Sequence, residues 1–381
     1  MFFYFLNMKK VLLITECLEK GVGKHVLDLY NEFKTDKTVK IWVAYGKERA
    51  DREFVNQIKS GDAIELKNLK RTIGFCDFKS FFEIKKLLKK IRPDVVHCHS
   101  SKAGFSGRIA AKLCKVNNII YSPHAYFFLK YEKKSIKRKI FELAEILLSR
   151  LFTTKTVTTS RGEDAVFLNS KIDKENKRIL IEHGLLVEEF SIERIREERN
   201  KYNVSDDEIL IGAMARFENQ KDPIGTFKIM KELIQKNSNV KCIFWGNGSY
   251  YDEIKKMNLE SDNVILLPGE TNTPELHLSI IDIYLTASLY EGLPYTLLTA
   301  LAYGLPIAAS CVEGNKDCVF ENDNGILFEP QNYQEAVNKI CNMINCESYK
   351  SMKKKSLKVF NERFSIDTMV KKYRSLYINE K

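Results

Sequence analysis

The sequence predicts two α/β domains, each built around a parallel β-sheet. Three observations lead to this fold class: the length of 381 residues, short β-branched runs that recur along the whole chain, and helical patterns between them. A chain of this length normally divides into domains of roughly 150 residues, each large enough to bury a core. Strands that alternate with helical stretches form βαβ units, whose strands run parallel.

The expected strands divide evenly between the two halves. In the first half they are residues 11–15, 39–43, 94–97, 118–121, 155–158 and 178–181. In the second half they are residues 209–213, 240–245, 264–267, 281–285, 306–309 and 325–328. Residues 186–205 are polar and lack strand character, so we place a linker there, between domains at 1–185 and 206–365. Open α/β sheets bind ligands at the carboxyl ends of their strands, so we expect the chemistry in a cleft between these domains.

The cysteines and the amino-terminal residues indicate the cellular compartment of the protein. The nine cysteines contain no Cys-x-x-Cys pair, which suggests neither a disulfide framework nor a zinc site and favours a reducing cytosol. The apolar opening, residues 1–8, is far shorter than the about 20 residues of a membrane span and lacks a charged leader region. We expect it to be a short extension ahead of a second possible start at Met8.

Positive charge is concentrated in the first half. Residues 1–185 hold 37 Lys and Arg against 21 Asp and Glu, whereas residues 186–381 hold 24 against 29, which together give the net charge of +11. This asymmetry indicates an anionic partner, either a membrane surface or nucleic acid, or else a Lys-rich composition that only solvates one domain. No nucleic-acid recognition motif or interleaved aromatic pattern accompanies the charge, so we expect no nucleic-acid partner.

A basic segment precedes an amphipathic helix in the first domain. Residues 130–139 hold six basic residues and one acid, Glu132, and the predicted helix continues to residue 152. One face of this helix is apolar and consists of Ile136, Ile140, Leu143, Ala144, Leu147 and Leu151. Such a segment can lie on an anionic membrane leaflet. The alternative is a helix that packs on the core and has a solvated basic end.

Glycines follow the first strand at the start of a helix. Gly21 and Gly23 stand where backbone N–H groups can hold a phosphate, although a purely structural tight turn is the alternative. A Walker A loop would need glycine at Leu18 and Ser or Thr at His25, and a dinucleotide fingerprint would need glycine at Val26. The sequence therefore does not support a P-loop NTPase or a dehydrogenase.

Two cations follow the first strand of the second domain. Arg216 and Lys221 lie five residues apart, and two fixed positive groups there can clamp a diphosphate, unless they belong to an ordinary solvated loop. Gly246 and Gly248 follow the next strand and allow close approach of the backbone.

Further motifs complete a family pattern. They are Ser288-Leu-Tyr-Glu-Gly-Leu-Pro294 and Ala302-Tyr-Gly-Leu-Pro306, with His97–Gly104, Ser122–Ala125 and Asn324–Phe328. Together with Arg216 and Lys221, they make the chain resemble, over nearly its whole length, the retaining glycosyltransferases of family 4, also called group 1. These enzymes have the GT-B fold of two Rossmann-like domains that face each other across a cleft. The resemblance is strongest to enzymes of bacterial capsular and exopolysaccharide synthesis.

The resemblance implies roles for individual residues. Arg216 and Lys221 would hold the donor diphosphate, and Glu291 would contact the donor sugar or its phosphate. The backbone of Gly292, Leu293 and Pro294 would line the phosphate site, with Gly246 and Gly248 also near the donor. Gly21 and Gly23 would approach the donor from the first domain, and His124 would lie beside the sugar, a structural histidine being the alternative. The last helix, 366–381, would return to the first domain.

The sequence departs from the family pattern at three places. The second glutamate of the family, which usually holds the ribose, is Thr299 here. The Pro-Asn-Gly turn before the linker is Glu182-His183-Gly184, and the glutamate that follows the last core strand is replaced by Asp317. These departures keep a second hypothesis open, in which the chain is a non-catalytic, glycosyltransferase-like partner subunit.

No metal site is expected. The sequence contains no Asp-x-Asp, so the charge of the leaving diphosphate must be neutralised by Arg216, Lys221 and helix N-termini. His97 and His99 flank one position at a strand end, and we expect them to point to opposite faces, which makes a metal pair improbable.

The resemblance, together with the lack of Asp-x-Asp, predicts a retaining, metal-independent hexosyltransferase. It would use a nucleoside diphosphate sugar as donor, a glycan on a polyprenyl diphosphate carrier as acceptor, and no cofactor. We expect it in the cytoplasm, in peripheral contact with the inner face of the membrane.

Overall fold

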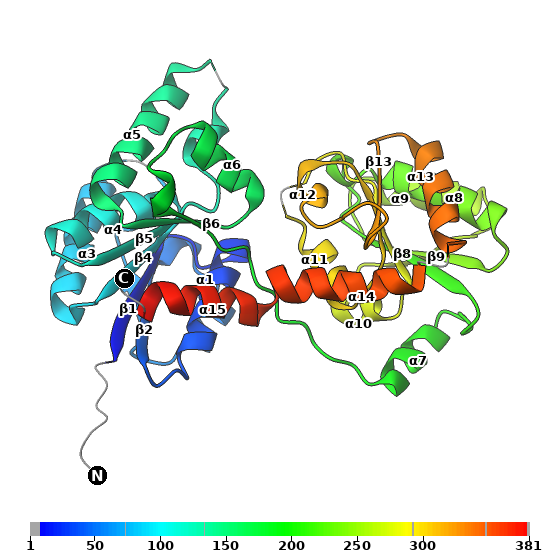
Figure 1. Cartoon of the computed structure of the whole chain (residues 1–381), viewed down its shortest axis with the longest axis horizontal. Coiled ribbons are helices and arrows are strands. Elements are labelled where there is room, and N and C mark those ends of the chain that lie inside the picture. Colours follow the sequence, from blue (N-terminus) through cyan, green and yellow to red (C-terminus); the bar gives the residue numbers. More distant parts are fainter. Residues whose placement is uncertain (1–7, 73, 133, 292, 347–348, 379–381) are drawn as a thin grey trace, which may run out of the picture. The chain divides into compact units, whose positions relative to one another are not determined.

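The computed structural model describes residues 8–72, 74–132, 134–291, 293–346 and 349–378 (Figure 1). The chain forms two compact units: unit 1 is Met1–His183 with Met369–Lys381, and unit 2 is Gly184–Thr368. Each unit contains one parallel sheet, which confirms the predicted fold class. Among the described residues, no helix combines the length and the apolar character needed to cross a membrane.

The sheet of unit 1 has seven strands in the order β3-β2-β1-β4-β5-β6-β7. The strands are β1 (Lys9–Thr15), β2 (Val39–Gly46), β3 (Ala63–Leu66), β4 (Val95–His99), β5 (Asn118–Ser122), β6 (Lys155–Thr158) and β7 (Arg178–Leu180). The helices are α1 (Lys20–Phe33), α2 (Arg52–Gln57), α3 (Phe75–Ile91), α4 (Ser100–Leu113), α5 (Ile136–Phe152), α6 (Arg161–Asn169) and α15 (Ile366–Ile378), of which α15 belongs to this unit from Met369 on. The strand order reverses between β1 and β4, where open α/β sheets place their ligand sites.

The sheet of unit 2 has six strands in the order β10-β9-β8-β11-β12-β13. The strands are β8 (Ile209–Met214), β9 (Val240–Trp245), β10 (Leu266–Gly269), β11 (Ile283–Thr286), β12 (Ile307–Ser310) and β13 (Gly325–Phe328). The helices are α7 (Ile192–Asn200), α8 (Pro223–Lys236), α9 (Tyr251–Leu259), α10 (Pro274–Ser279), α11 (Tyr295–Ala302), α12 (Glu313–Lys316), α13 (Tyr333–Ile344) and α14 (Tyr349–Val359). The stretch expected to be a linker, 186–205, contains α7 and belongs to this unit.

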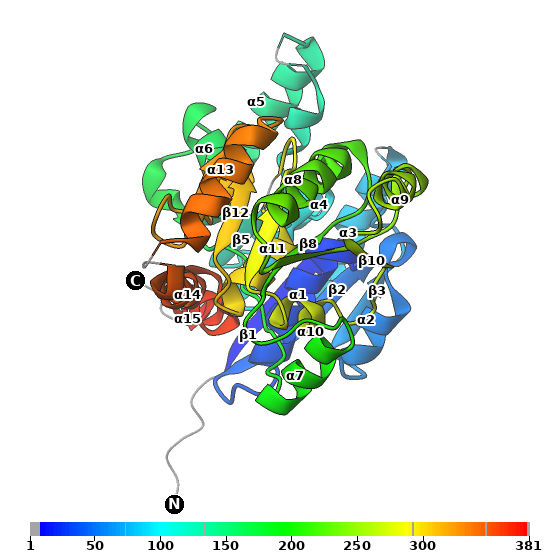
Figure 2. The same ribbon diagram turned by 90° about the vertical axis from the view of Figure 1, so that its right-hand side faces the viewer.

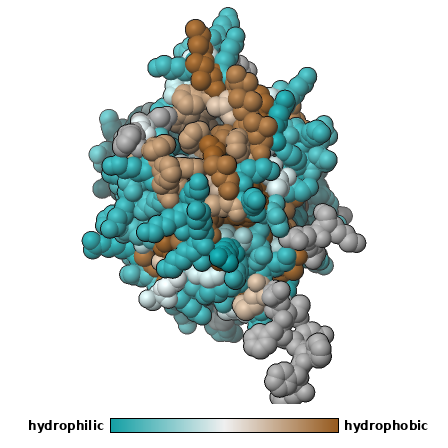
Figure 3. Space-filling view, turned by 90° about the vertical axis from the view of Figure 1, so that its left-hand side faces the viewer, coloured by the Kyte–Doolittle hydropathy of each residue, from teal (hydrophilic) through white to brown (hydrophobic). Residues whose placement is uncertain are grey.

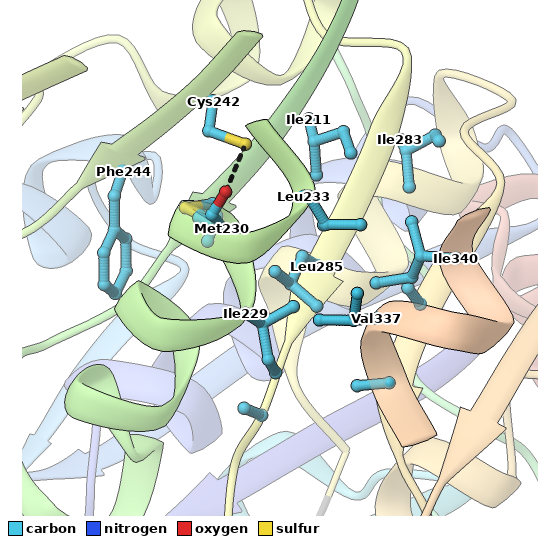
Figure 4. Close-up of a cluster of buried hydrophobic side chains, with 14 of the residues drawn as sticks. Ile211, Ile229, Met230, Leu233, Cys242, Phe244, Ile283, Leu285, Val337 and Ile340 are labelled. Carbon is cyan, nitrogen blue, oxygen red and sulfur yellow. Dashed lines mark hydrogen bonds between the residues drawn. The ribbon is translucent and has the colours of Figure 1, made fainter. Parts of the chain in front are cut away.

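The core of unit 2 explains why the sequences of its strands are nearly continuous apolar runs. Helices α8 and α13 lie side by side against the sheet (Figure 2), with Ile229 and Leu233 of α8 packed among strand residues such as Ile211 and Ile283 (Figure 4). A parallel sheet covered by helices on both faces leaves no polar face on its strands. Polar side chains that bind ligands are therefore expected beyond the ends of the strands.

Candidate functional site

Arg216 and Lys221 both lie in the loop that follows β8 in unit 2. Lys221 ends a short 3-10 turn, Asn219–Lys221, and the next residue, Asp222, accepts a hydrogen bond from the backbone N–H of Gly225 at 3.0 Å to begin α8. The side chain of Arg216 is exposed, whereas that of Lys221 is half-buried. The strand end and the helix cap thus hold the backbone around both cations.

Lys221 forms an ion pair with Glu291, which lies beyond the end of β11. Nζ of Lys221 is 2.5 Å from Oε1 of Glu291, and the two side chains are 19% and 6% exposed. The backbone ties the same two loops together, because the N–H of Leu289 donates to the carbonyl oxygen of Gln220 at 2.8 Å. The sequence predicted both residues at the donor site but not this pairing between residues 70 positions apart. A diphosphate would compete with Glu291 for Lys221.

The glycines after β9 bring two loops of unit 2 together. A Cβ atom at Gly246 would stand 2.0 Å from the carbonyl oxygen of Ala215, and one at Gly248 would stand 2.7 Å from that of Phe217. The backbone N–H of Phe217 donates to the carbonyl oxygen of Asn247 at 2.8 Å. Both glycines are therefore required for packing against the loop that carries Arg216. Their contact with a donor remains a prediction.

The N-terminus of α11 lies close to Glu291 in the sequence. Pro294 precedes the helix, no described side chain caps it, and its first turn carries no acidic residue. Uncapped N–H groups at a helix N-terminus attract anions. Leu293 and Pro294 are half-buried, and the predicted contact at Gly292 lies outside the described residues.

Thr299 lies in the second turn of α11 and is buried. Its hydroxyl donates to the carbonyl oxygen of Tyr295 at 3.0 Å, and the neighbouring residues Leu298 and Ala300 are also buried. This geometry is that of a packed helix residue whose hydroxyl is bonded within its own helix. A role of Thr299 in ribose binding stays a prediction.

The two glycines of unit 1 lie inside the first turn of α1, which begins at Lys20. A Cβ atom at Gly23 would stand 2.6 Å from the backbone of Leu18, whereas one at Gly21 would meet nothing within 4 Å. The N–H of Gly23 already donates to the carbonyl oxygen of Glu19 at 3.0 Å. Packing therefore explains why position 23 is a glycine, but it gives no reason for a glycine at position 21.

The expectation that His97 and His99 point to opposite faces is wrong. Their ring centroids lie 3.9 Å apart, because side chains two positions apart on a strand share a face. His97 is buried between two hydroxyls: Nδ1 lies 2.7 Å from the hydroxyl oxygen of Tyr377, and Nε2 lies 2.9 Å from that of Ser122.

His124 contacts His99 and lies in an unusual backbone conformation. Nε2 of His124 is 3.0 Å from Nδ1 of His99. The φ angles of His124 and Ala125 are 52° and 106°, which are uncommon for residues with a side chain. The N–H of Ala125 donates to Oε1 of the buried Glu163 at 2.8 Å, so a specific hydrogen bond holds this turn. Such backbone strain is typical of functional sites.

Two further histidines join this group, which we call the histidine cluster: His25, His97, His99, His124 and His183. Nδ1 of His25 lies 3.0 Å from Nδ1 of His183, and its ring centroid lies 5.1 Å from that of His124. The cluster contains five of the six histidines in the chain. Burial lowers the pKa of His97 to about 3 and that of His183 to about 4. Their positions in the sequence do not group them, since His25 and His183 come from distant segments that only the fold brings together.

Helix α5 turns its apolar face to solvent, so the alternative that this face packs on the core is wrong. Five of its apolar side chains are between 49% and 75% exposed: Ile136, Ile140, Leu143, Leu147 and Leu151. The opposite side of the helix is the buried one, with Glu145 bonded to the buried Arg108 at 2.8 Å. Figure 3 shows apolar side chains gathered on this side of unit 1 and bordered by hydrophilic ones.

Comparison with known proteins identifies the family. Residues 19–156 match the family described as glycosyl transferase 4-like, and residues 194–359 match the family described as glycosyl transferases group 1. The chain is a glycosyltransferase with a group 1 domain. This glycosyltransferase is 27% identical over 313 residues to the UDP-Gal:alpha-D-GlcNAc-diphosphoundecaprenol alpha-1,3-galactosyltransferase of Escherichia coli, a match that covers 80% of each chain. It is 24% identical to the capsular polysaccharide biosynthesis glycosyltransferase CapM of Staphylococcus aureus, over 84% of this chain and 88% of CapM.

Solved structures confirm the GT-B fold. HepE of Anabaena in complex with UDP matches the group 1 glycosyltransferase described here with a TM-score of 0.75 and 15% identity, over 96% of this chain and 98% of HepE. A glycosyltransferase from Rickettsia africae matches with a TM-score of 0.76 and 19% identity, over 98% of this chain and 100% of that one.

Proposed function

We propose that this glycosyltransferase transfers a hexose-type sugar, with retained configuration, from a nucleoside diphosphate donor to a lipid-linked glycan in surface polysaccharide synthesis. The observation that carries the proposal is the Lys221–Glu291 ion pair next to the loop of the exposed Arg216, where strands β8 and β11 end. Arg and Lys side chains are the usual partners of diphosphate oxygens. The donor and acceptor classes are supported by the names of the E. coli relative and of the UDP complex of HepE.

The proposed reaction uses the donor phosphate as its own base. The bond between the anomeric carbon and the diphosphate oxygen breaks, the acceptor oxygen bonds to the same face of that carbon, and the acceptor proton passes to the leaving phosphate oxygen. Arg216, Lys221 and the N-terminus of α11 stabilise the negative charge that develops on the diphosphate. Since the sequence has no Asp-x-Asp, we propose that no metal ion bridges the donor and that no cofactor is needed. His124 would position the sugar.

We further propose that α5 docks unit 1 on the anionic, cytoplasmic face of a membrane. Its apolar face is uncovered, and four exposed lysines precede it or lie in its first turn: Lys130, Lys134, Lys137 and Lys139. Of the two other basic residues in the segment, Arg138 is half-buried and Lys133 lies outside the described residues. An apolar helix face inserts among lipids while each lysine near an anionic surface adds about 1 kcal/mol of attraction. A lipid-linked acceptor would be presented at such a surface.

The experiment that tests the transfer reaction is incubation of the purified chain with a panel of nucleotide sugars, with release of free nucleoside diphosphate as the readout. Slow hydrolysis of one donor without acceptor is expected, and Lys221→Ala should abolish it. NMR of the product formed on a matching lipid-linked acceptor then shows whether the configuration is retained. Absence of both hydrolysis and binding for every donor would contradict the proposal and favour the non-catalytic partner subunit.

A further inference from the structure

The histidine cluster holds three imidazoles, of which the proposed reaction uses only His124, to position the sugar. One ring nitrogen from each of His25, His99 and His124 lies within 4.8 Å of the others. Nδ1 of His99 and Nε2 of His124 are 3.0 Å apart. Nitrogens around a tetrahedral zinc ion, at about 2.0–2.1 Å from the metal, stand about 3.4 Å apart. Small side-chain adjustments would therefore bring all three nitrogens to one ion.

A second observation concerns His99. Its Nε2 is completely buried and has no hydrogen-bond partner among the described residues. Buried polar atoms are nearly always partnered, so an orphaned imidazole nitrogen inside a group of imidazoles needs an explanation. Because one imidazole presents a single ring nitrogen to an ion, Nε2 and the Nδ1 that faces His124 are alternative ligand atoms of His99. Its neighbour His97, in contrast, has a hydroxyl on each ring nitrogen and needs no further partner.

We propose that His25, His99 and His124 bind a divalent transition-metal ion, and that Zn²⁺ is the natural occupant. Three imidazoles are a ligand set that suits zinc, and they leave a fourth position open. The ion would join α1, the end of β4 and the turn after β5. The inference concerns unit 1 only and does not depend on the diphosphate site proposed in unit 2.

The surroundings of the three histidines fit a metal site. Nε2 of His25 lies 3.2 Å from the hydroxyl of Tyr373, which is the outer contact that normally fixes the tautomer of a metal-bound imidazole. The ligand atom of His25 would then be Nδ1, and the metal would replace its contact with Nδ1 of His183 at 3.0 Å. The hydrogen bond from the N–H of Ala125 to Glu163 holds the turn that carries His124. Burial lowers the pKa of His25, His99 and His124 well below the usual value, so each ring is neutral and keeps a lone pair for a metal.

The test uses the full chain without a polyhistidine tag, stripped with a chelator and titrated with Co²⁺ as a spectroscopic substitute for Zn²⁺. One equivalent of Co²⁺ should produce the visible bands of a low-symmetry site. These bands should appear without the near-ultraviolet band of a cobalt–thiolate bond. Such a band would show that the cobalt binds instead to one or more of the nine cysteines, which are the competing ligands. Excess Zn²⁺ should displace the cobalt.

A cluster variant and its matched control show whether the metal ion binds at the histidine cluster. His124→Ala should weaken metal binding about 100-fold or more. His277→Ala, which removes the one histidine outside the cluster, should leave it unchanged. A thiolate band, equal losses in both variants, or a wild-type chain that binds no cobalt would overturn the proposal. Should His124→Ala fail to fold, His124→Gln replaces it, and the wild-type spectrum alone still separates imidazole from thiolate ligands. Every readout is metal binding, so failure here leaves the proposed transfer reaction untouched.

Discussion

Replacing Lys221 with alanine separates a structural role of the Lys221–Glu291 pair from a role in donor binding. The variant leaves the carboxylate of Glu291, 6% exposed, without the cation that lies 2.5 Å away. Removing one partner of a fully buried pair costs about 3–5 kcal/mol. Because the side chain of Lys221 is 19% exposed and water can replace part of it, we expect a loss of about 2–3 kcal/mol in the free energy of unfolding. Urea denaturation followed by tryptophan fluorescence measures this loss.

The same variant should lose turnover for a different reason. A contact between Lys221 and the leaving diphosphate strengthens in the transition state, and removing one such charge-assisted contact lowers turnover by about 100-fold or more. Turnover is measured as release of nucleoside diphosphate from a verified donor, below the urea concentrations that unfold the variant.

The double variant Lys221→Met with Glu291→Gln distinguishes the two roles. It removes both charges while keeping similar side-chain volumes, so stability should return to within about 1 kcal/mol of the wild type. Turnover should stay low, because no cation is restored at the diphosphate. If turnover recovered together with stability, the pair would be purely structural and the diphosphate assignment of Lys221 would be refuted. Near-normal turnover of Lys221→Ala would lead to the same conclusion.

Three further predictions follow from other parts of the chain. Thr299→Glu should lower the donor KM with little change in kcat if this position faces the ribose; loss of the fold or unchanged donor binding would show that Thr299 only packs in α11. Replacing three lysines of α5 and its approach with Gln should weaken binding to anionic vesicles, and salt should do the same, whereas an equal change in unit 2 should not. The first set is Lys134, Lys137 and Lys139, and the control set is Lys228, Lys255 and Lys256. Burial lowers the pKa of His277, which stacks on Trp245 at 5.0 Å, so the imidazole gains its proton at a lower pH than an unperturbed histidine does. In a Trp42→Phe background, the fall of fluorescence on acidification should therefore have its midpoint below the pKa of an unperturbed histidine, and His277→Gln should remove the fall.

Most strands could be predicted because a buried strand has a nearly continuous apolar sequence. Residues 11–14 of β1 are fully buried, and the sequence there is a continuous apolar run. The strand that was not predicted, β3, is a short edge strand, Ala63–Leu66, in which only Leu66 is buried. An edge strand packs on fewer neighbours and needs no such run. The periodicity of α5 was also plain, but a pattern of apolar residues does not state whether a face meets the core or the solvent.

The candidate sites depend on contacts between residues far apart in the chain. The register of the unit 1 sheet places Thr15, His99 and Ser122 side by side, at the end where His25 and His124 follow their strands. The local pattern of apolar residues indicates where each strand lies in the sequence. The register depends on the strand order β1-β4-β5 in the sheet, which that pattern does not indicate. The Lys221–Glu291 pair depends in the same way on β8 lying next to β11.

The two units carry different chemistry, and this makes the metal site independent of the diphosphate site. The imidazoles of the histidine cluster are neutral near pH 7, because burial lowers their pKa, so they add no positive charge with which to offset a diphosphate. They offer lone pairs instead, which a divalent cation needs and a phosphate does not. Arg216 and Lys221 offer the reverse: both are N–H donors without a lone pair for a metal. Chelators should therefore remove the ion from unit 1 without changing nucleotide affinity at unit 2, whereas Lys221→Ala should weaken nucleotide binding and leave the cobalt spectrum unchanged.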